Sequence, residues 1–389
     1  MIARQISASI KKLLPKYPII AVTGPRQSGK TTLLKNILPD YRYVSLENPD
    51  NRAFATDDPN GFLKKYNEQV IFDEVQRVPT LIPYLQTFVD NSGMMGQFVI
   101  SGSQNFHLLE NITQSLAGRV ALFKLLPFDS SELKQAALLS SGWDTMITKG
   151  FYPAIYDRDI EPAMFYNNYL QTYIDRDIVG LTNVQDLRKF RNFIGLCAAR
   201  TGQLLNLNNL ANQCGITQPT AKSWLSILES SYVVFLLQPY FENFSKRIVK
   251  TPKLYFYDVG LAAFLLGLRD SDELASLQQS GNLFENLVIA DIIKKNHHQY
   301  LLREYWFWRD SNGHEIDLLH KSAKGFDVFE IKSTSTVLPK LFKGMDYFDN
   351  ISEGRTRKKY LIYGGDETQD RTDYTIYTWN GFYTSSRQD

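Results

Sequence analysis

The segment Gly24–Thr31, with the sequence GPRQSGKT, matches the phosphate-binding loop pattern G-x-x-x-x-G-K-[ST]. Glycines let such a loop turn its backbone N–H groups toward phosphates, and a helix that begins near Lys30 directs its positive end at them. We expect Lys30 to reach the β- and γ-phosphates and Thr31 to hold Mg²⁺. The apolar run Pro18–Val22 before the loop is typical of a buried strand. The sequence therefore predicts a nucleoside triphosphate site between a strand and a helix.

Two adjacent acids, Asp73 and Glu74, follow a second apolar run, Val70–Phe72. Phosphoryl transfer needs a carboxylate near the metal ion and a group that activates the attacking water. We predict that Asp73 holds Mg²⁺ through water and that Glu74 activates the water that attacks the γ-phosphate. The alternative is a solvated turn at the end of a strand. The phosphate loop upstream favours the catalytic interpretation.

The next predicted strand, Phe98–Gln104, ends in small polar residues rather than acids. Ser103 or Gln104 would bind the γ-phosphate or the attacking water, although a serine here could equally cap the following helix. The residues predicted to contact the nucleotide are Gly24, Pro25, Arg26, Gln27, Ser28, Gly29, Lys30, Thr31, Thr32, Ser103 and Gln104.

Arg119 directly precedes another predicted strand, Val120–Leu126. The planar, permanently charged guanidinium suits an arginine finger, which stabilises the charge that develops on a phosphate during transfer. Because Arg119 lies far from the loop in sequence, we expect it to act on a neighbouring subunit, which requires an oligomer. An ordinary surface ion pair is the other interpretation of this residue, and the sequence does not decide between the two.

The C-terminal part of the chain carries acids and a lysine with a spacing typical of metal-dependent phosphodiester cleavage. Glu330 and Lys332 are two residues apart and share one face of a predicted strand, and Asp317 lies on the preceding strand. We predict that Glu285, Asp317 and Glu330 hold a metal ion and that Lys332 orients the attacking water. The pattern E…D…ExK resembles that of the PD-(D/E)XK nuclease superfamily. A solvated sheet face would also carry alternating charges.

A helix-turn-helix pattern occupies Leu207–Leu225, with a glycine turn at Gly215, and two strand-like runs follow it, Val233–Leu237 and Leu254–Tyr257. A winged helix is the simplest interpretation, used either for DNA contact or only for packing or oligomerisation. For DNA contact, the second helix would enter the major groove, and the basic wing, the segment Asn243–Lys253 that joins the two strands, would contact phosphates. The predicted DNA contacts are Lys222, Lys246, Arg247, Lys250 and Lys253, with Gln218, Thr220 and Ser223 as further candidates.

The bulk composition describes an ordered protein large enough for several domains. The chain has 389 residues, 43% of them hydrophobic, and a net charge of +2 that neither supports nor excludes nucleic-acid binding. Its two cysteines suggest neither a disulfide framework nor a zinc site, and they fit a cytoplasmic protein. Apolar residues at Ile2, Ile6 and Ile10 predict an N-terminal helix that packs on the nucleotide domain. No window is apolar enough to cross a membrane.

Four motifs, GPRQSGKT, VIFDEVQ, ISGSQ and SLAGRV, occur in an order and spacing that resemble those of AAA+-type ATPases of bacteria and archaea with a C-terminal domain of unknown function. The resemblance spans nearly the whole chain, and the first two motifs are specific as a pair. It implies ATP as the nucleotide and a homo-oligomer, a full or partial ring such as a hexamer.

The expected fold is α/β, with a P-loop AAA+ ATPase core, a helical and winged-helix middle and a C-terminal restriction-endonuclease-like α/β domain. We place the ATPase domain at residues 1–135 and a helical connector at 136–205. The winged helix follows at 206–280, and the nuclease-like domain at 281–389.

The leading functional hypothesis is an oligomeric ATPase that uses ATP and Mg²⁺ and acts on DNA, including branched DNA such as four-way junctions. A second hypothesis is a nucleotide-controlled switch or scaffold whose nuclease-like domain is only a docking module. A third is a metal-dependent DNA nuclease gated by ATP. The sequence does not decide whether the C-terminal domain cleaves DNA.

Overall fold

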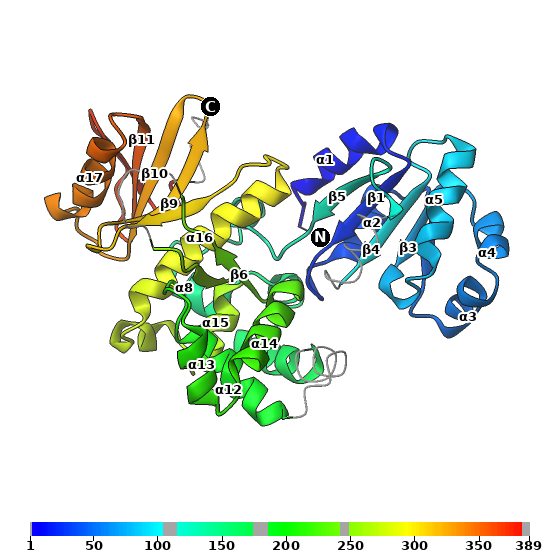
Figure 1. Cartoon of the computed structure of the whole chain (residues 1–389), viewed down its shortest axis with the longest axis horizontal. Coiled ribbons are helices and arrows are strands. Elements are labelled where there is room, and N and C mark those ends of the chain that lie inside the picture. The colour runs from blue at the N-terminus through cyan, green and yellow to red at the C-terminus, as the bar shows by residue number, and fades with distance from the viewer. Residues whose placement is uncertain (1, 104–114, 174–185, 242–248, 383–389) are drawn as a thin grey trace. The chain divides into compact units, whose positions relative to one another are not determined.

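The computed structural model describes residues 2–103, 115–173, 186–241 and 249–382 (Figure 1). The chain divides into two compact units. The first consists of residues 1–128, 230–233 and 294–301, and the second contains the rest of the chain. Among the described residues, no helix is both long enough and apolar enough to span a bilayer.

The first unit is built on a five-stranded parallel sheet in the order β2-β3-β4-β1-β5. Because all five strands run in the same direction, the residues that follow each of them lie along one edge of the sheet. Ligands of open α/β sheets bind at this carboxyl edge. The strands are β1 (Ile19–Thr23), β2 (Arg42–Ser45), β3 (Val70–Asp73), β4 (Phe98–Gly102) and β5 (Val120–Lys124).

Helices cover both faces of this sheet, so its central strands are buried on both sides. Alternate residues of β1 point to opposite faces: Ile19 packs with α3, α4 and α5, whereas Ile20 packs with α1 and α2. Ile6 and Ile10 of α1 are fully buried there, which confirms the predicted packing of the N-terminal helix. The helices are α1 (Ile6–Leu13), α2 (Lys30–Ile37), α3 (Pro49–Asp57), α4 (Pro59–Lys65) and α5 (Leu81–Ser92).

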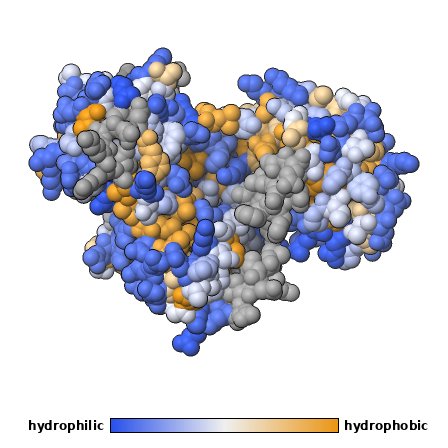
Figure 2. All heavy atoms as spheres, in the orientation of Figure 1, coloured by the Kyte–Doolittle hydropathy of each residue, from blue (hydrophilic) through white to orange (hydrophobic). Residues whose placement is uncertain are grey.

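The surface of the first unit over α3 and α4 is largely polar on the face seen in Figure 2. The inward side chains of α4, Phe62 and Leu63, are fully buried. Such helices bury one side and expose the other, as expected for a surface layer of a globular α/β domain.

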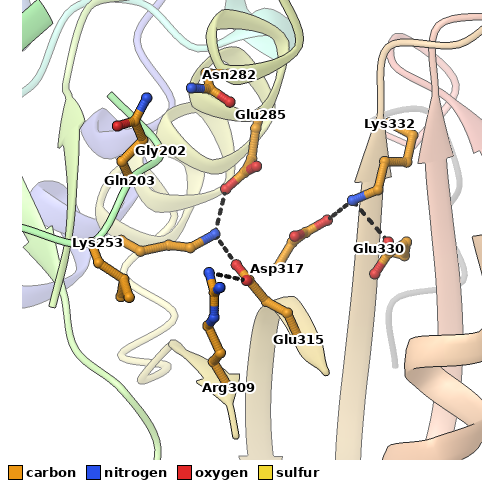
Figure 3. Close-up of a pocket in the computed structure, with 11 residues that line it drawn as sticks. Gly202, Gln203, Lys253, Asn282, Glu285, Arg309, Glu315, Asp317, Glu330 and Lys332 are labelled. Carbon is orange, nitrogen blue, oxygen red and sulfur yellow. Dashed lines mark hydrogen bonds and ion pairs between the residues drawn. The ribbon is translucent and has the colours of Figure 1, made fainter. Parts of the chain in front are cut away.

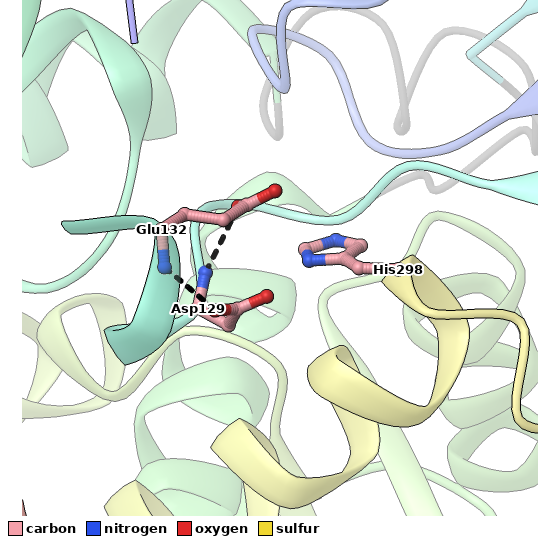
Figure 4. A group of neighbouring side chains, drawn as sticks. All are labelled: Asp129, Glu132 and His298. Atoms are coloured by element: carbon pink, nitrogen blue, oxygen red, sulfur yellow. Dashed lines mark hydrogen bonds between the residues drawn. The ribbon is translucent and has the colours of Figure 1, made fainter. Parts of the chain in front are cut away.

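The second unit begins with a run of helices. The first of them, α7, starts with a capping box: the Asp129 side chain accepts from the Glu132 backbone N–H at 2.9 Å, and the Glu132 carboxylate accepts from the Asp129 N–H at 3.3 Å (Figure 4). These reciprocal bonds fix where the helix begins. The helices are α7 (Ser130–Gln135), α8 (Trp143–Lys149), α9 (Pro153–Asp157), α10 (Pro162–Tyr169), α12 (Leu187–Ala198), α13 (Leu207–Cys214), α14 (Gln218–Ser230) and α15 (Val259–Leu265).

The predicted helix-turn-helix corresponds to α13 and α14. Gly215 has φ 62°, a left-handed conformation that glycine adopts easily, and it ends α13. Two short antiparallel strands follow, β6 (Val234–Leu237) and β7 (Lys253–Phe256), close to the runs predicted as strands. The winged-helix assignment itself stays a prediction.

A six-stranded sheet in the order β12-β13-β11-β10-β9-β8 forms the C-terminal part of the second unit. β9 is antiparallel to both β8 and β10, whereas β11 is parallel to β10 and β13. α17 packs on one face of the sheet through Met345 and Phe348. The elements are α16 (Ser280–His298), β8 (Trp306–Arg309), β9 (Glu315–Ser322), β10 (Gly325–Lys332), α17 (Lys343–Ile351), β11 (Thr356–Tyr363), β12 (Gln369–Asp370) and β13 (Thr375–Thr378).

The predicted division into four domains stays a prediction. The first unit ends its N-terminal stretch at Phe128, before the predicted boundary at residue 135. It also includes residues 230–233, which begin with the last residue of α14, and residues 294–301, which contain the end of α16. Sequence patterns cannot show that these distant segments belong to the first unit, because unit boundaries depend on which segments pack together.

Candidate functional site

The phosphate loop connects β1 to α2, as the sequence predicted, and two of its glycines cannot be replaced without strain. At Gly24, φ is 154° and an added Cβ would lie 2.0 Å from the Leu125 carbonyl oxygen. At Gly29, φ is 90° in a left-handed conformation at the start of α2. The loop therefore depends on backbone shapes that favour glycine.

The remaining loop residues differ in exposure. Pro25 and Ser28 are buried, and the Ser28 hydroxyl donates to the Pro25 carbonyl at 2.9 Å. Gln27 and Thr32 are exposed, and the Arg26 guanidinium lies 4.0 Å from the Glu47 carboxylate. The nucleotide contacts expected for these side chains stay predictions.

Lys30 is buried, and its ammonium group donates to backbone carbonyls of its own loop. The bonds to the carbonyl oxygens of Gly24 and Pro25 are 3.0 and 2.8 Å long. Burial lowers the pKa of Lys30 to about 8, against the opposing effect of the Glu74 and Asp73 carboxylates. A buried ammonium whose positive charge is incompletely compensated is well suited to bind a polyanion such as a triphosphate.

Asp73, at the end of β3, receives hydrogen bonds from three hydroxyl groups. Thr31 and Tyr43 each donate to Oδ2 at 2.7 Å, and Ser101 donates to Oδ1. The sequence predicted the meeting of Thr31 and Asp73. It did not identify Tyr43 or Ser101, whose only signal is a polar group on a strand neighbouring β3.

Glu74 adopts a left-handed backbone conformation, with φ 57° and ψ 45°. This is an uncommon conformation for a residue with a side chain, and such strain is concentrated at functional sites. Its Oε2 accepts from the Ser103 hydroxyl at 3.0 Å and from the Gln76 amide. Gln76 also donates to Ser103 at 3.2 Å, so it orients both groups, and the sequence did not identify it as a site residue. Gln104 lies outside the described residues.

Arg119 lies at the end of the sheet opposite the phosphate loop. Its carbonyl oxygen accepts from the N–H of Ile19, the first residue of β1, whereas the loop follows the last residue, Thr23. A strand of this length spans about 16 Å. The guanidinium makes a two-point ion pair with Asp90, Nε to Oδ1 at 2.5 Å and Nη2 to Oδ2 at 2.9 Å. Arg119 therefore lies far from the nucleotide site of its own sheet.

An acidic cavity of about 530 Å³ lies in the second unit (Figure 3). It brings together the four C-terminal residues that the sequence predicted as a site, together with basic and acidic groups that the prediction did not include. The lining residues are Gly202, Gln203, Leu204, Lys253, Asn282, Glu285, Arg309, Glu315, Asp317, Glu330 and Lys332.

Lys332 links the two acids that the sequence placed on neighbouring strands. Its ammonium lies 2.8 Å from Asp317 Oδ2 and 2.8 Å from Glu330 Oε1. Burial, reinforced by the Asp317 charge, raises the pKa of Glu330 to about 8 although Lys332 opposes this. Burial alone would raise the pKa of Asp317, but Lys332 and Lys253 hold it below its ordinary value. The predicted convergence of two carboxylates and one ammonium is therefore present.

A divalent cation fits this cavity chemically. Carboxylate oxygens are the ligands that Mg²⁺ prefers, and Glu330 Oε2 is buried without a hydrogen-bond partner among the described residues. Glu285, from α16, lines the same cavity as Asp317 and Glu330. Glu285, Asp317 and Glu330 thus line one cavity with Lys332, but their ligand atoms do not all lie within 4.8 Å of one another, so a shared cation would require these side chains to move closer together.

Lys253 requires a correction to the predicted DNA contacts. It is only 3% exposed and belongs to β7, not to an exposed wing. Its ammonium lies 2.9 Å from Glu285 Oε1 and contacts Glu315 Oε1. A buried lysine paired with two carboxylates is not available to contact DNA phosphates.

The other predicted DNA contacts have different positions. Gln218, Lys222 and Ser223 are exposed on α14, opposite its buried residues Ala221 and Trp224. Further positions are Thr220, which is half-buried, Lys250, which is exposed, and Lys246 and Arg247, which lie outside the described residues.

Three parts of the chain match known protein families. Residues 16–134 match the family described as AAA domain. Residues 140–272 and 280–381 match two families described as domains of unknown function, DUF8612 and DUF4143.

Two relatives are similar over most of their length. They are the uncharacterized protein Mb2031c of Mycobacterium bovis and the uncharacterized protein Rv2008c of Mycobacterium tuberculosis. Each is 31% identical over 341 residues, which cover 86% of this chain and 74% of the relative. Among solved structures, the Walker-type ATPase PABY2304 of Pyrococcus abyssi is 14% identical, with a TM-score of 0.44. That match covers 67% of this chain and 94% of the archaeal one.

Proposed function

We propose that this chain, which belongs to the same family as the two mycobacterial proteins and carries an AAA-type ATPase domain, hydrolyses ATP with Mg²⁺ and couples hydrolysis to action on DNA. The observation that carries the hydrolysis is the meeting of Lys30, Thr31, Asp73 and Glu74 at one edge of the parallel sheet. The action on DNA rests on the second unit and is argued separately below.

Each residue at this edge has a distinct chemical role. Lys30 would exchange its bonds with the loop carbonyls for the β- and γ-phosphates, and Thr31 and Asp73 would hold the Mg²⁺ that neutralises phosphate charge. Glu74 would take the proton of the attacking water, while Ser103 and Gln76 keep its carboxylate oriented.

Phosphate release from ATP and from GTP, with and without Mg²⁺, tests the hydrolysis. We expect Mg²⁺-dependent release from ATP, lost in Lys30→Ala, since an ammonium–phosphate contact contributes about 1.5–3 kcal/mol. Lys64→Ala is the matched control, because it makes the same substitution at an exposed lysine of α4 that has no predicted contact with nucleotide or metal. Equal release by wild type and Lys30→Ala would contradict the proposal.

We further propose that Arg119 completes the ATP site of a neighbouring subunit in a homo-oligomeric ring, such as a hexamer. The position of Arg119 at the far end of its own sheet supports action between subunits. The exposed ion pair with Asp90 would hold the guanidinium until a neighbour docks.

Mixing variants tests this arrangement. We expect Arg119→Ala to reduce hydrolysis by about a thousandfold or more, the range known for arginine fingers, and mixing with Glu74→Gln to restore part of it. Asp90→Asn is the control, because it breaks the same ion pair but keeps the arginine. If Asp90→Asn is as inactive as Arg119→Ala, the ion pair rather than a finger explains the loss.

DNA is the proposed target because of features of the second unit. Gln218, Lys222 and Ser223 project from one exposed side of α14, as a groove-reading helix requires. Glu285, Asp317, Glu330 and Lys332 share a cavity whose chemistry suits phosphodiester substrates and a divalent cation. A role on branched DNA such as four-way junctions is the leading form of this proposal.

ATP hydrolysis should be compared over single-stranded, duplex, forked and four-way junction DNA, alongside DNA binding. Stimulation by one of these structures is the expected result. Absence of both binding and stimulation for all four would contradict the DNA proposal and favour a nucleotide-controlled switch or scaffold. Lys253 and Lys332 already pair with acids of the cavity, and this neutralisation favours the switch or scaffold.

Cleavage of DNA distinguishes the third candidate, a nuclease gated by ATP. The unpartnered, buried Glu330 Oε2 favours it, since a metal ion would use that oxygen. Mg²⁺-dependent cleavage that disappears in Glu330→Ala, with ATP hydrolysis retained, would support the nuclease. Cleavage that persists in Glu330→Ala would exclude this cavity as its site.

A further inference from the structure

Lys253 belongs to the segment that matches DUF8612, yet its ammonium group lies in the acidic cavity that strands β8, β9 and β10 of the C-terminal sheet line in part (Figure 3). It is 3% exposed and is paired with Glu285, at 2.9 Å, and with Glu315. Glu315 also binds Arg309 at 2.9 Å. Lys253 and Arg309 therefore already neutralise the acids on one side of the cavity.

The backbone on both sides of Lys253 is fixed. Within the two-stranded sheet Lys253 pairs with Leu237 of β6, and on its other side it bridges to Leu204. The neighbouring Pro252 carbonyl accepts from the Leu205 N–H at 2.8 Å, and the Leu254 N–H donates to the Gln203 carbonyl at 3.1 Å. The ammonium therefore reaches the cavity from a backbone position that is held on both sides, unlike that of a freely rotating surface lysine.

A second residue of β7 reinforces this contact. Tyr255 lies two positions after Lys253, on the same side of the strand, and its hydroxyl donates to the same Glu285 Oε1 at 2.6 Å. The next residue of α16, Asn286, accepts from the Phe256 N–H at 2.8 Å and donates to the Phe256 carbonyl at 2.9 Å. These bonds join α16 to β7 and keep the Glu285 carboxylate beside Lys253.

The other side of the cavity is less completely satisfied. Lys332 contacts one oxygen each of Asp317 and Glu330. The remaining Glu330 oxygen, Oε2, is buried and has no hydrogen-bond partner among the described residues. An unpaired oxygen acceptor therefore remains at Glu330, whereas Oε1 of Glu285 is occupied by Lys253 and Tyr255.

We infer that Lys253 is a tethered counter-ion of this cavity, which competes with a divalent cation for Glu285 and so sets the affinity of the site for metal. This rests on the metal role proposed for Glu285, Asp317 and Glu330. A cation bound to either oxygen of Glu285 would lie within several ångströms of the Lys253 ammonium, and like charges this close repel each other strongly. Metal binding is therefore weak while β7 holds Lys253 against Glu285, and it strengthens when that ammonium is removed.

Binding of Mn²⁺ to the nucleotide-free full chain, measured by titration calorimetry, tests the inference. We expect Lys253→Met to bind Mn²⁺ about tenfold more tightly than wild type, or more, because a repelling charge at contact distance is lost. Lys324→Met is the matched control: it removes the same charge from an exposed lysine outside the cavity, and its affinity should equal that of wild type. The gain should disappear in the double variant Lys253→Met/Glu330→Gln.

Equal Mn²⁺ affinity in wild type and Lys253→Met overturns the inference. If that shared binding is lost in Glu330→Gln, only the role of Lys253 fails, whereas absence of binding in every variant also contradicts the proposed metal site. Lys253→Gln offers a second neutral variant that can still donate a hydrogen bond, should Lys253→Met not fold. In wild type itself, micromolar Mn²⁺ should leave the Tm unchanged, and a rise that Glu330→Gln abolishes overturns the inference independently.

Discussion

The phosphate loop and the acidic cavity both place lysines near carboxylates, but they balance charge in different ways. At the loop, Lys30 donates to backbone carbonyls, and Asp73 accepts from hydroxyl groups. In the cavity, the lysines pair directly with the acids: Lys253 with Glu285, and Lys332 with Asp317. The loop therefore keeps its ammonium and its acid apart, whereas the cavity neutralises its own charges.

The pKa values of the lysines shift in opposite directions at the two sites. Burial lowers the pKa of Lys30 because backbone carbonyls and the nearby acids compensate its charge only in part. Burial also acts against the charged form of Lys253 and Lys332, but their carboxylate partners outweigh it and raise both pKa values. A site that separates its charges is prepared for a ligand with charges of both signs, such as a triphosphate with Mg²⁺. A compensated site is stable without one.

The largest expected effect comes from the same substitution made at both sites. Glu74→Gln should lower the rate of ATP hydrolysis by about 10²–10⁴-fold, because the proton acceptor for the attacking water is lost. Glu330→Gln should leave that rate unchanged. Phosphate release, with ATP binding measured separately, checks both. A comparable loss in Glu330→Gln would show that the two sites are coupled and not independent.

Replacing each lysine by methionine should change stability in different ways. Lys253→Met leaves Glu285 and Glu315 without their shared partner, and breaking a buried ion pair typically costs about 3–5 kcal/mol. Lys30→Met removes an incompletely compensated buried charge, so the free energy of unfolding should hold or increase. Urea denaturation of nucleotide-free protein, in EDTA, provides the measurement. Equal destabilisation by both variants would show that the two sites do not differ in how they compensate their lysines.

Lys30 should also give the first unit a distinctive pH dependence. Its folded pKa of about 8 lies below the ordinary 10.5, so between these values the unfolded chain binds more protons and stability rises with pH. The rise should be roughly 1–3 kcal/mol. Lys30→Met should lack this component, and the difference between the two stability profiles isolates it from other titrating groups. Identical profiles from pH 8 to 10 would contradict the assignment.

The smallest effect concerns exposed lysines, which contrast with buried Lys253. Lys222→Ala should weaken binding to all DNA sequences similarly and reduce the slope of log affinity against log salt by about 1. Lys324→Ala, at an exposed turn between β9 and β10, is the control and should leave the slope unchanged. Fluorescence anisotropy over a salt series measures both. An unchanged slope in Lys222→Ala would remove α14 from the DNA proposal.

Sequence spacing predicted those site residues that belong to short, continuous patterns. Lys30 and Thr31 lie in one loop, and Asp73 follows one strand, so local geometry and a parallel sheet suffice to bring them together. Glu330 and Lys332 were predicted for the same reason, since they share one strand face. Tyr43 and Ser101 were missed, because nothing in their local sequence marks a polar residue as facing Asp73.

The sequence by itself determined the phosphate loop, its acids and the E…D…ExK set, because chain connectivity and strand periodicity fix those arrangements locally. Only the tertiary structure decided the environment of Lys253. A lysine in a basic segment looks the same whether it is exposed or buried, and its partners Glu285 and Glu315 lie 32 and 62 residues away in sequence. Burial and charge pairing depend on which distant segments pack together, and that information is not local.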